Sequence, residues 1–193
     1  MKKRMIAALI LSLALLSGCA ATDDPAPTPA PTETVISSGK CFKITQDRTD
    51  GVTKYDYTVT DESGNVLESA ICARQPRVAV INDDLIGIRF YTDDRSFCRY
   101  YDVKNGLVSE SYFNAFWDNG RLVAYNDYAG GHRMVVCGIF DTEGYRFVQE
   151  IDCSAPAITV TECVENEETG ELTVKYVYGN DSSSSGTVKL QTK

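Results

Sequence analysis

The feature that most constrains the fold is a succession of short β-strand patterns, each ended by turn-forming residues. From residue 41 onward, no segment has the 3.6-residue apolar period of an amphipathic helix. Alternating, β-branched and aromatic runs are instead separated by Gly, Asn, Asp and Ser. We therefore predict an all-β domain built as an antiparallel meander of short strands. The predicted strands are residues 41–46, 54–60, 66–72, 77–81, 85–92, 96–103, 107–113, 121–128, 133–140, 145–151, 157–164, 171–178 and 187–191.

The strand pattern repeats about every forty residues. Three segments align on acidic turn residues spaced by 41 and then 39 positions, namely Asp61, Asp102 and Asp141. In this alignment, two strand positions ahead of each turn become equivalent. One holds Tyr57, Cys98 and Cys137, and the other holds Val59, Tyr100 and Ile139. Since strand side chains alternate with period two, these positions predict a shared inward face. The length and order of the repeat resemble β-propeller blades. A β-sandwich or an open barrel is the alternative.

The first eighteen residues have the layout of an export signal. Three cations at positions 2–4 precede an apolar run over 5–16, and small residues precede Cys19. The run has twelve residues, whereas a helix that spans a bilayer needs about 20. We therefore expect a cleaved signal over residues 1–18.

The end of this signal, Leu16-Ser17-Gly18-Cys19, resembles the lipobox of bacterial lipoproteins. The resemblance implies a diacylglyceryl group on the Cys19 sulfur, cleavage before Cys19, and acylation of the new amino terminus by a fatty acid such as palmitate. Several acyl chains on one residue suffice for stable anchoring. We therefore expect the protein at the cell membrane, anchored by lipid on its extracytoplasmic face in the cell envelope.

Residues 19–40 predict a spacer that follows the lipidated cysteine. The segment after Cys19 holds four of the six prolines, together with Ala, Thr and Ser. Such a composition cannot bury a core and favours extended conformations. The predicted organisation is therefore a signal peptide (1–18), a lipidated spacer (19–40) and an extracytoplasmic all-β domain (41–193).

The cysteines leave two interpretations open. If Cys19 carries lipid, six remain: Cys41, Cys72, Cys98, Cys137, Cys153 and Cys163. An even number in an exported domain permits three disulfides, whose pairing the sequence does not determine. Most of these cysteines also lie in apolar strand patterns, where a free thiol behaves as a small hydrophobic side chain.

Charge and motif content exclude several functions. Removing the three cations of residues 1–18 changes the formal charge from −8 to −11, which disfavours binding to nucleic acid. The one histidine, His132, follows two glycines at a predicted hairpin tip, where we expect it to be exposed. No nucleophile elbow or CxxC pair occurs. We predict no catalytic residue, no metal site and no cofactor.

Aromatic residues near predicted turns are the remaining candidates for a binding surface. They are Tyr112, Phe116, Trp117, Tyr125 and Tyr128. The favoured interpretation is a membrane-anchored, non-catalytic binding or interaction module whose ligand is a protein, peptidoglycan or another glycan. Whether the chain is an enzyme stays open. The alternatives are a tethered hydrolase acting on carbohydrate or cell wall, and a scaffold subunit of an envelope complex.

Overall fold

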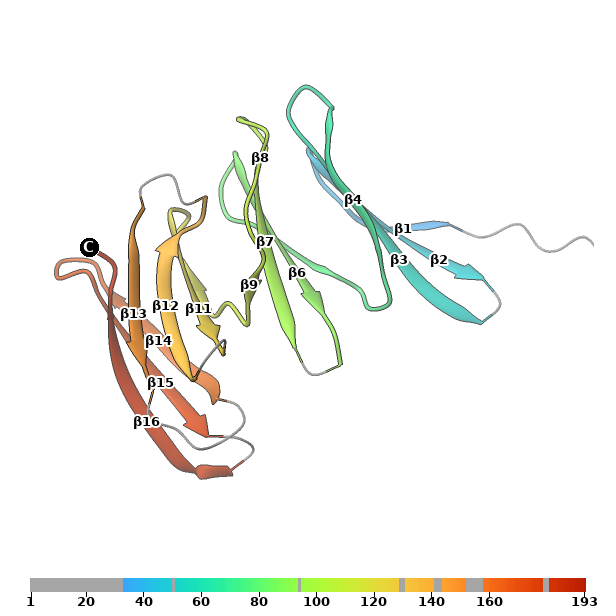
Figure 1. Cartoon of the computed structure of the whole chain (residues 1–193). Helices are drawn as coiled ribbons and strands as arrows, with labels where there is room; N and C mark the ends of the chain where they lie inside the picture. The colour runs from blue at the N-terminus through green and yellow to red at the C-terminus, as the bar shows by residue number, and fades with distance from the viewer. Residues whose placement is uncertain are drawn as a thin grey trace, which may run out of the picture. The chain divides into compact units, whose positions relative to one another are not determined.

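The computed structural model describes residues 33–49, 51–93, 95–128, 131–140, 144–151, 158–178 and 181–193, with the backbone alone at 181–184. These residues form strands β1 to β16 and no helix (Figure 1). The strands build four antiparallel sheets, and no sheet among the described residues closes into a barrel. The predicted all-β antiparallel meander is therefore confirmed. The predicted signal and Cys19 lie outside the described residues.

The first two sheets follow chain order. The first sheet has the order β1-β2-β3-β4, formed by Thr34–Ser38, Phe42–Thr49, Val52–Thr60 and Val66–Cys72. The second sheet has the order β5-β6-β7-β8, with β9 also paired to β7, and its strands are Arg77–Val80, Leu85–Tyr91, Ser96–Asp102, Leu107–Val108 and Tyr112–Phe113.

The last two sheets repeat this arrangement. The third sheet has the order β10-β11-β12-β13, formed by Trp117–Asp118, Leu122–Asp127, Arg133–Gly138 and Arg146–Glu150. The fourth sheet has the order β14-β15-β16, formed by Ile158–Asn166, Glu171–Tyr178 and Asp181–Gln191. Each sheet is thus assembled from consecutive segments of the chain.

The strand predictions fail in four places, one of which is β10 (Trp117–Asp118), a strand that no predicted segment covers. Strand β1 lies within the predicted spacer 19–40, so the first sheet begins before residue 41; the β-branched residues Val35 and Ile36 carry this strand. The predicted strand 107–113 is divided into β8 and β9, because between them the Ser109 side chain, and not a backbone oxygen, pairs with the Tyr100 N–H of β7. The Ser109 hydroxyl accepts from Tyr100 N at 2.9 Å and donates to Glu110 O at 2.7 Å. In the fourth sheet, β16 begins within the Ser-rich segment expected to be a loop.

Acidic turn residues hold the hairpins as the repeat predicts. Asp61 Oδ1 accepts hydrogen bonds from the backbone N–H groups of Ser63 and Asn65, both at 2.8 Å. Asp102 Oδ1 accepts from the N–H groups of residues 104 and 105 in the same way. Gly64 follows Asp61 with a φ of 86°, a conformation that glycine adopts without a steric penalty. The third turn residue, Asp141, lies outside the described residues.

Three apolar clusters join consecutive sheets. The first interface lies between the first and second sheets, the second interface between the second and third, and the third interface between the third and fourth. Their buried members include, in that order, Ile44, Val59, Ile88 and Tyr101; Tyr100, Tyr112, Val123 and Val135; and Met134, Val136, Leu172 and Val174. The core of residues 33–193 is therefore divided among interfaces between neighbouring sheets.

The two middle sheets are buried on both faces. Tyr100 points into the second interface and Tyr101 into the first, while Val135 and Val136 point into the second and third. Adjacent side chains on a strand point to opposite faces, so neighbouring residues are both buried when each face is covered. This explains the continuous apolar runs of β6 and β12.

The repeated positions are all buried, but they do not all face the same way. Tyr57 and Cys98 point toward the following sheet, whereas Cys137 and Ile139 point back toward the second sheet. A shift of one residue along a strand reverses the face of every side chain. The predicted shared inward face is therefore correct for the first two repeats and wrong for the third.

The outer faces of the end sheets differ from the buried faces. On the fourth sheet, Lys175 and Glu162 form an ion pair at 2.7 Å, and Lys189 and Glu171 form one at 3.0 Å. The outer face of the first sheet carries Lys43, Lys54, Asp56 and Ser69 between the exposed side chains of Val35 and Ile71. Neither outer face is a continuous apolar surface of the kind that the middle sheets bury.

The described cysteines lie in, or pack against, the apolar interfaces between the sheets. Cys41, Cys72, Cys98 and Cys163 carry free thiols, so a framework of three disulfides is not formed. Cys137 is buried in the second interface, and Cys153 lies outside the described residues. Burial raises the pKa of the Cys98 thiol and raises the pKa of Cys163 to about 12. These two thiols therefore stay protonated at neutral pH and are poor nucleophiles.

Candidate functional site

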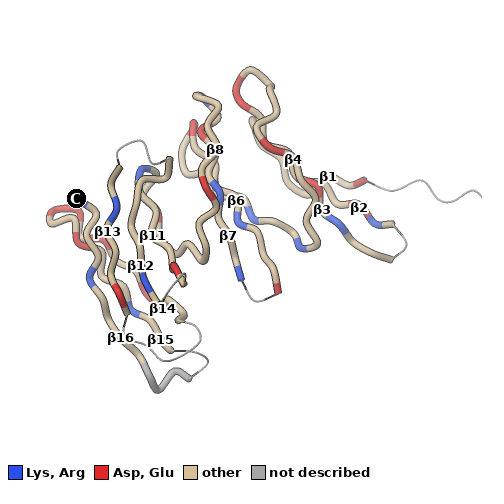
Figure 2. The backbone as a smooth tube through the Cα atoms, in the orientation of Figure 1, with Lys and Arg blue, Asp and Glu red and all other residues tan. Residues whose placement is uncertain are grey.

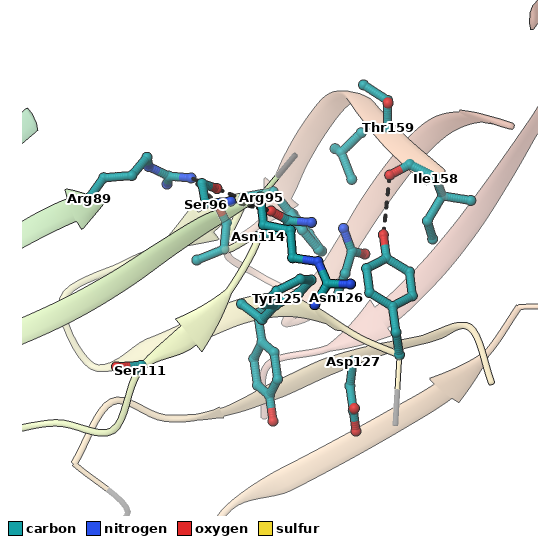
Figure 3. Close-up of a pocket in the computed structure, with 15 residues that line it drawn as sticks. Arg89, Arg95, Ser96, Ser111, Asn114, Tyr125, Asn126, Asp127, Ile158 and Thr159 are labelled. Carbon is teal, nitrogen blue, oxygen red and sulfur yellow. Dashed lines mark hydrogen bonds between the residues drawn. The ribbon is translucent and has the colours of Figure 1, made fainter. Parts of the chain in front are cut away.

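A groove of about 1060 Å³ crosses the edges of three sheets (Figure 3). One side is formed by β6, the start of β7 and the segment 111–116, the floor by the end of β11, and the other side by the first residues of β14. This binding groove brings together residues that are up to about seventy positions apart in the chain (89 and 160). Its volume is in the range of sites that hold small molecules.

Three of the five predicted aromatic residues line the binding groove: Phe116, Tyr125 and Tyr128. Tyr112 is instead buried in the second interface, where its hydroxyl donates to the backbone oxygens of Gly138 and Ile139. Trp117 packs against the third interface. The sequence does not distinguish aromatic residues of the core from those of the groove, because both kinds occur within residues 112–128.

A series of ring contacts forms one wall of the groove. The Phe113 ring lies edge-on to Phe97 at 5.2 Å and to Tyr128 at 5.6 Å between centroids, and the Arg95 guanidinium lies over it at 5.2 Å. Tyr128 in turn meets His132 at 5.3 Å. His132 is therefore half-buried, which corrects the expected exposed turn histidine. Edge-to-face contacts of this kind fix ring positions and connect the second sheet to β11.

The segment between β9 and β10 is held against β7 by Asn114. Asn114 has a φ of 45°, a left-handed conformation that asparagine tolerates better than most residues. Its Oδ1 accepts from Ser96 N at 3.0 Å, and its N donates to Ser96 O at 2.8 Å. Arg89 Nη1 donates to Ala115 O at 2.7 Å from the opposite side. This wall is therefore fixed by its own hydrogen bonds.

The end of β11 places polar side chains on both of its faces. Figure 3 shows Tyr125 and Asp127 on one side of the strand and Asn126 on the other. Asp127 forms an ion pair with Arg133 at 2.6 Å, and Arg146 lies 4.0 Å away. Burial raises the pKa of Tyr125, although nearby Arg146 opposes the shift. The phenol is therefore neutral at physiological pH.

Asn126 is the polar residue that sequence reasoning missed. It is 3% exposed and lines the groove, yet its Oδ1 has no hydrogen-bond partner among the described residues. A buried amide oxygen in this state destabilises the fold by about 1–3 kcal/mol. The available signal was an asparagine directly after the run 122–125 in the predicted strand 121–128, where a buried polar residue needs a partner.

The polar content of the groove differs from that of the chain as a whole. The chain has a formal charge of −8, but Arg89 and Arg95 both line the groove, and Asp127 is the single carboxylate among its described lining residues. Figure 2 shows basic residues on β6, β7 and β12 next to the acidic residues of the turns. Glycoside hydrolysis by paired carboxyl groups therefore has no support in this lining.

A second, smaller pocket of about 560 Å³ lies between the first and second sheets and contains Glu68. The Glu68 carboxylate accepts hydrogen bonds from Tyr57 Oη at 2.6 Å, Tyr101 Oη at 2.9 Å and Arg99 Nη1 at 2.5 Å. Burial alone would raise the pKa of Glu68, but the bonds from Arg99, Tyr57 and Tyr101 lower it overall. Arg99 also donates to Ser111. This carboxylate network is fully paired and ties the two sheets together.

Two features are absent from the described part of the chain. There, no three His, Cys, Asp or Glu side chains converge as they would at a metal site. The same residues include no helix of sufficient length and apolar character to cross a bilayer.

Comparison with known proteins gives no relative from which a role could be transferred. A scan against models of protein families finds no match, and a search of curated protein sequences finds no similar protein.

Proposed function

We propose that the chain is a lipoprotein, anchored at the extracytoplasmic face of the cell membrane, whose all-β domain is a non-catalytic binding module. The anchor is inferred from the leader and its lipobox-like end at Cys19. The binding role is carried by one observation, the groove across three sheets with aromatic and polar side chains on a scaffold of neighbouring sheets. Fixed walls of this kind favour binding, because little order has to be gained when a ligand enters.

The groove supports binding better than catalysis. Its described lining offers one carboxylate, Asp127, which Arg133 neutralises, and no thiol. The acid Asp118 does not line the groove; burial raises its pKa, opposed by the hydrogen bond from Tyr100. A tethered hydrolase would need an acid and a base facing one ligand, and no such pair lines the groove within the described residues.

The anchor is tested by replacing the cysteine. Cys19→Ser should abolish incorporation of labelled palmitate, because both expected acyl attachments depend on Cys19. The matched control is Cys72→Ser, which removes a half-buried free thiol and should leave labelling unchanged. Labelling that persists in Cys19→Ser would contradict the proposed anchor.

The binding role is tested with full-length protein in detergent and isolated cell-wall sacculi, which carry both glycan and peptide. Cosedimentation that Tyr128→Ala weakens, with no sugar or peptide released into the supernatant, is the expected result. Released fragments would indicate a hydrolase. Absence of cosedimentation would argue against a wall-binding module.

A further inference from the structure

The amide oxygen of Asn126, a residue that lines the binding groove, has no hydrogen-bond partner among the described residues. Asn126 is 3% exposed. In Figure 3 the Asn126 side chain lies on the side of β11 away from Asp127, and Arg95 and Tyr128 line the same groove. The terminal torsion of asparagine is soft, so rotation about it can turn the amide oxygen toward the groove. A ligand that donates a hydrogen bond to Asn126 Oδ1 would remove the free-energy cost of this unpaired oxygen.

The ligand must carry a hydrogen-bond donor. An apolar chain offers none, and a simple anion offers acceptors alone, so both would leave Asn126 Oδ1 unpaired. The groove also presents donors of its own: Arg89 has one N–H group on Ala115 O, and a second contact from the same nitrogen reaches Ser96 at 3.5 Å. A guanidinium carries five N–H donors, and these two contacts involve Nη1 alone. The lining thus calls for a ligand that both donates and accepts.

A peptide added as a strand would satisfy this requirement, but β14 is poorly prepared for one. The backbone oxygen of Ile158, at the groove end of this edge strand, already accepts a hydrogen bond from Tyr128 Oη at 3.5 Å. The register of β14 is interrupted by a bulge between Val160 and Glu162, just beyond the groove. Bulges of this kind prevent strand addition at exposed edges.

A saccharide meets the remaining requirements. Each sugar hydroxyl donates and accepts, so it can pair with a carboxamide and with a guanidinium at once. The partly exposed rings of Phe116 and Tyr128 supply apolar surface for the C–H groups of a sugar ring. We propose that the binding groove holds a saccharide and that one ligand hydroxyl donates to Asn126 Oδ1. This assignment rests on the proposed binding function and names its ligand class.

The test measures binding and stability on the same variant. Full-length protein in detergent is titrated calorimetrically with three hexasaccharides, of N-acetylglucosamine, glucose and galacturonic acid, and with an alanine-rich hexapeptide. At least one hexasaccharide should bind, and Asn126→Leu should weaken it by about tenfold. The same variant should unfold at an equal or higher urea concentration, because leucine removes the unpaired amide at nearly constant size.

The control is Thr173→Val on the outer face of the fourth sheet, which should bind as the wild type does. Failure of all three hexasaccharides at millimolar concentration would overturn the saccharide assignment, as would unchanged affinity in Asn126→Leu. A lower urea midpoint for this variant would show that Asn126 is structural. Binding of the hexapeptide alone, with cosedimentation on sacculi retained, would reject the saccharide and leave the proposed binding function standing.

Discussion

The Glu68 carboxylate connects the first and second sheets, so its neutralisation should weaken that interface. Glu68 is 19% exposed in its side chain and accepts three hydrogen bonds, one of them from the 32%-exposed Arg99. Glu68→Gln keeps the shape and neutral bonds to the two tyrosines but loses the charge. Charge-assisted bonds exceed neutral ones by about 1 kcal/mol each, and partial exposure reduces the sum. We expect a loss of about 2 kcal/mol in the free energy of unfolding at neutral pH.

The loss should depend on pH in a defined direction. The folded-state pKa of Glu68 is lowered below its ordinary value of 4.5, so the stabilisation is complete above that pH and disappears as the pH falls through the folded value. Urea unfolding at about pH 7 and about pH 3 should therefore give a large difference between wild type and Glu68→Gln at the higher pH and a small one at the lower.

An exposed ion pair provides the control for this experiment. Lys40 and Glu62 lie 2.5 Å apart, but their side chains are 73% and 39% exposed. Glu62→Gln should leave the free energy of unfolding nearly unchanged, because exposed pairs contribute little. An equal difference between wild type and Glu68→Gln at both pH values, or a variant more stable than wild type, would refute the reasoning.

Two further predictions concern the core. Met134 is fully buried in the third interface, so Met134→Ala should lower the free energy of unfolding, measured by urea titration, by about 2–5 kcal/mol. The control is Val164→Ala at a 54% exposed position, which should change this free energy by less than about 0.5 kcal/mol. Cys163, with a pKa of about 12, should react with iodoacetamide at about pH 8 far more slowly in the folded protein than in urea, as peptide mass spectrometry would show; equal rates would contradict its burial.

Local patterns predicted the strands well where burial and turn chemistry agree. The bounds of β4 and β15 match the predicted strands 66–72 and 171–178, because each follows a turn that contains a glycine with positive φ, Gly64 or Gly170. Strand β1 was missed because its neighbours are prolines and small residues, which indicate a spacer. The start of β16 was missed because four serines indicate a loop, although β15 supplies its pairing.

The stacking of the sheets could not be read from the same patterns. Alternation shows which side chains share a face, but not which neighbouring sheet covers it, so the reversed direction of Cys137 was not predictable. The groove was predictable in part: Phe116, Tyr125 and Tyr128 stood out as aromatics near turns. Ile158 joins the groove because the fourth sheet packs on the third, which is a tertiary contact without a local signal.

Division of the core among successive sheets has a consequence for biogenesis. Ribosomes release the amino-terminal end first, and each sheet here is complete before the next one is made. A nascent chain can therefore close its hairpins locally and dock each new layer on the last, with no long wait for a distant partner. The exposed surface at any moment is the face of the newest layer, so a stall or truncation after residue 151 would leave the apolar side of the third sheet uncovered and prone to aggregate.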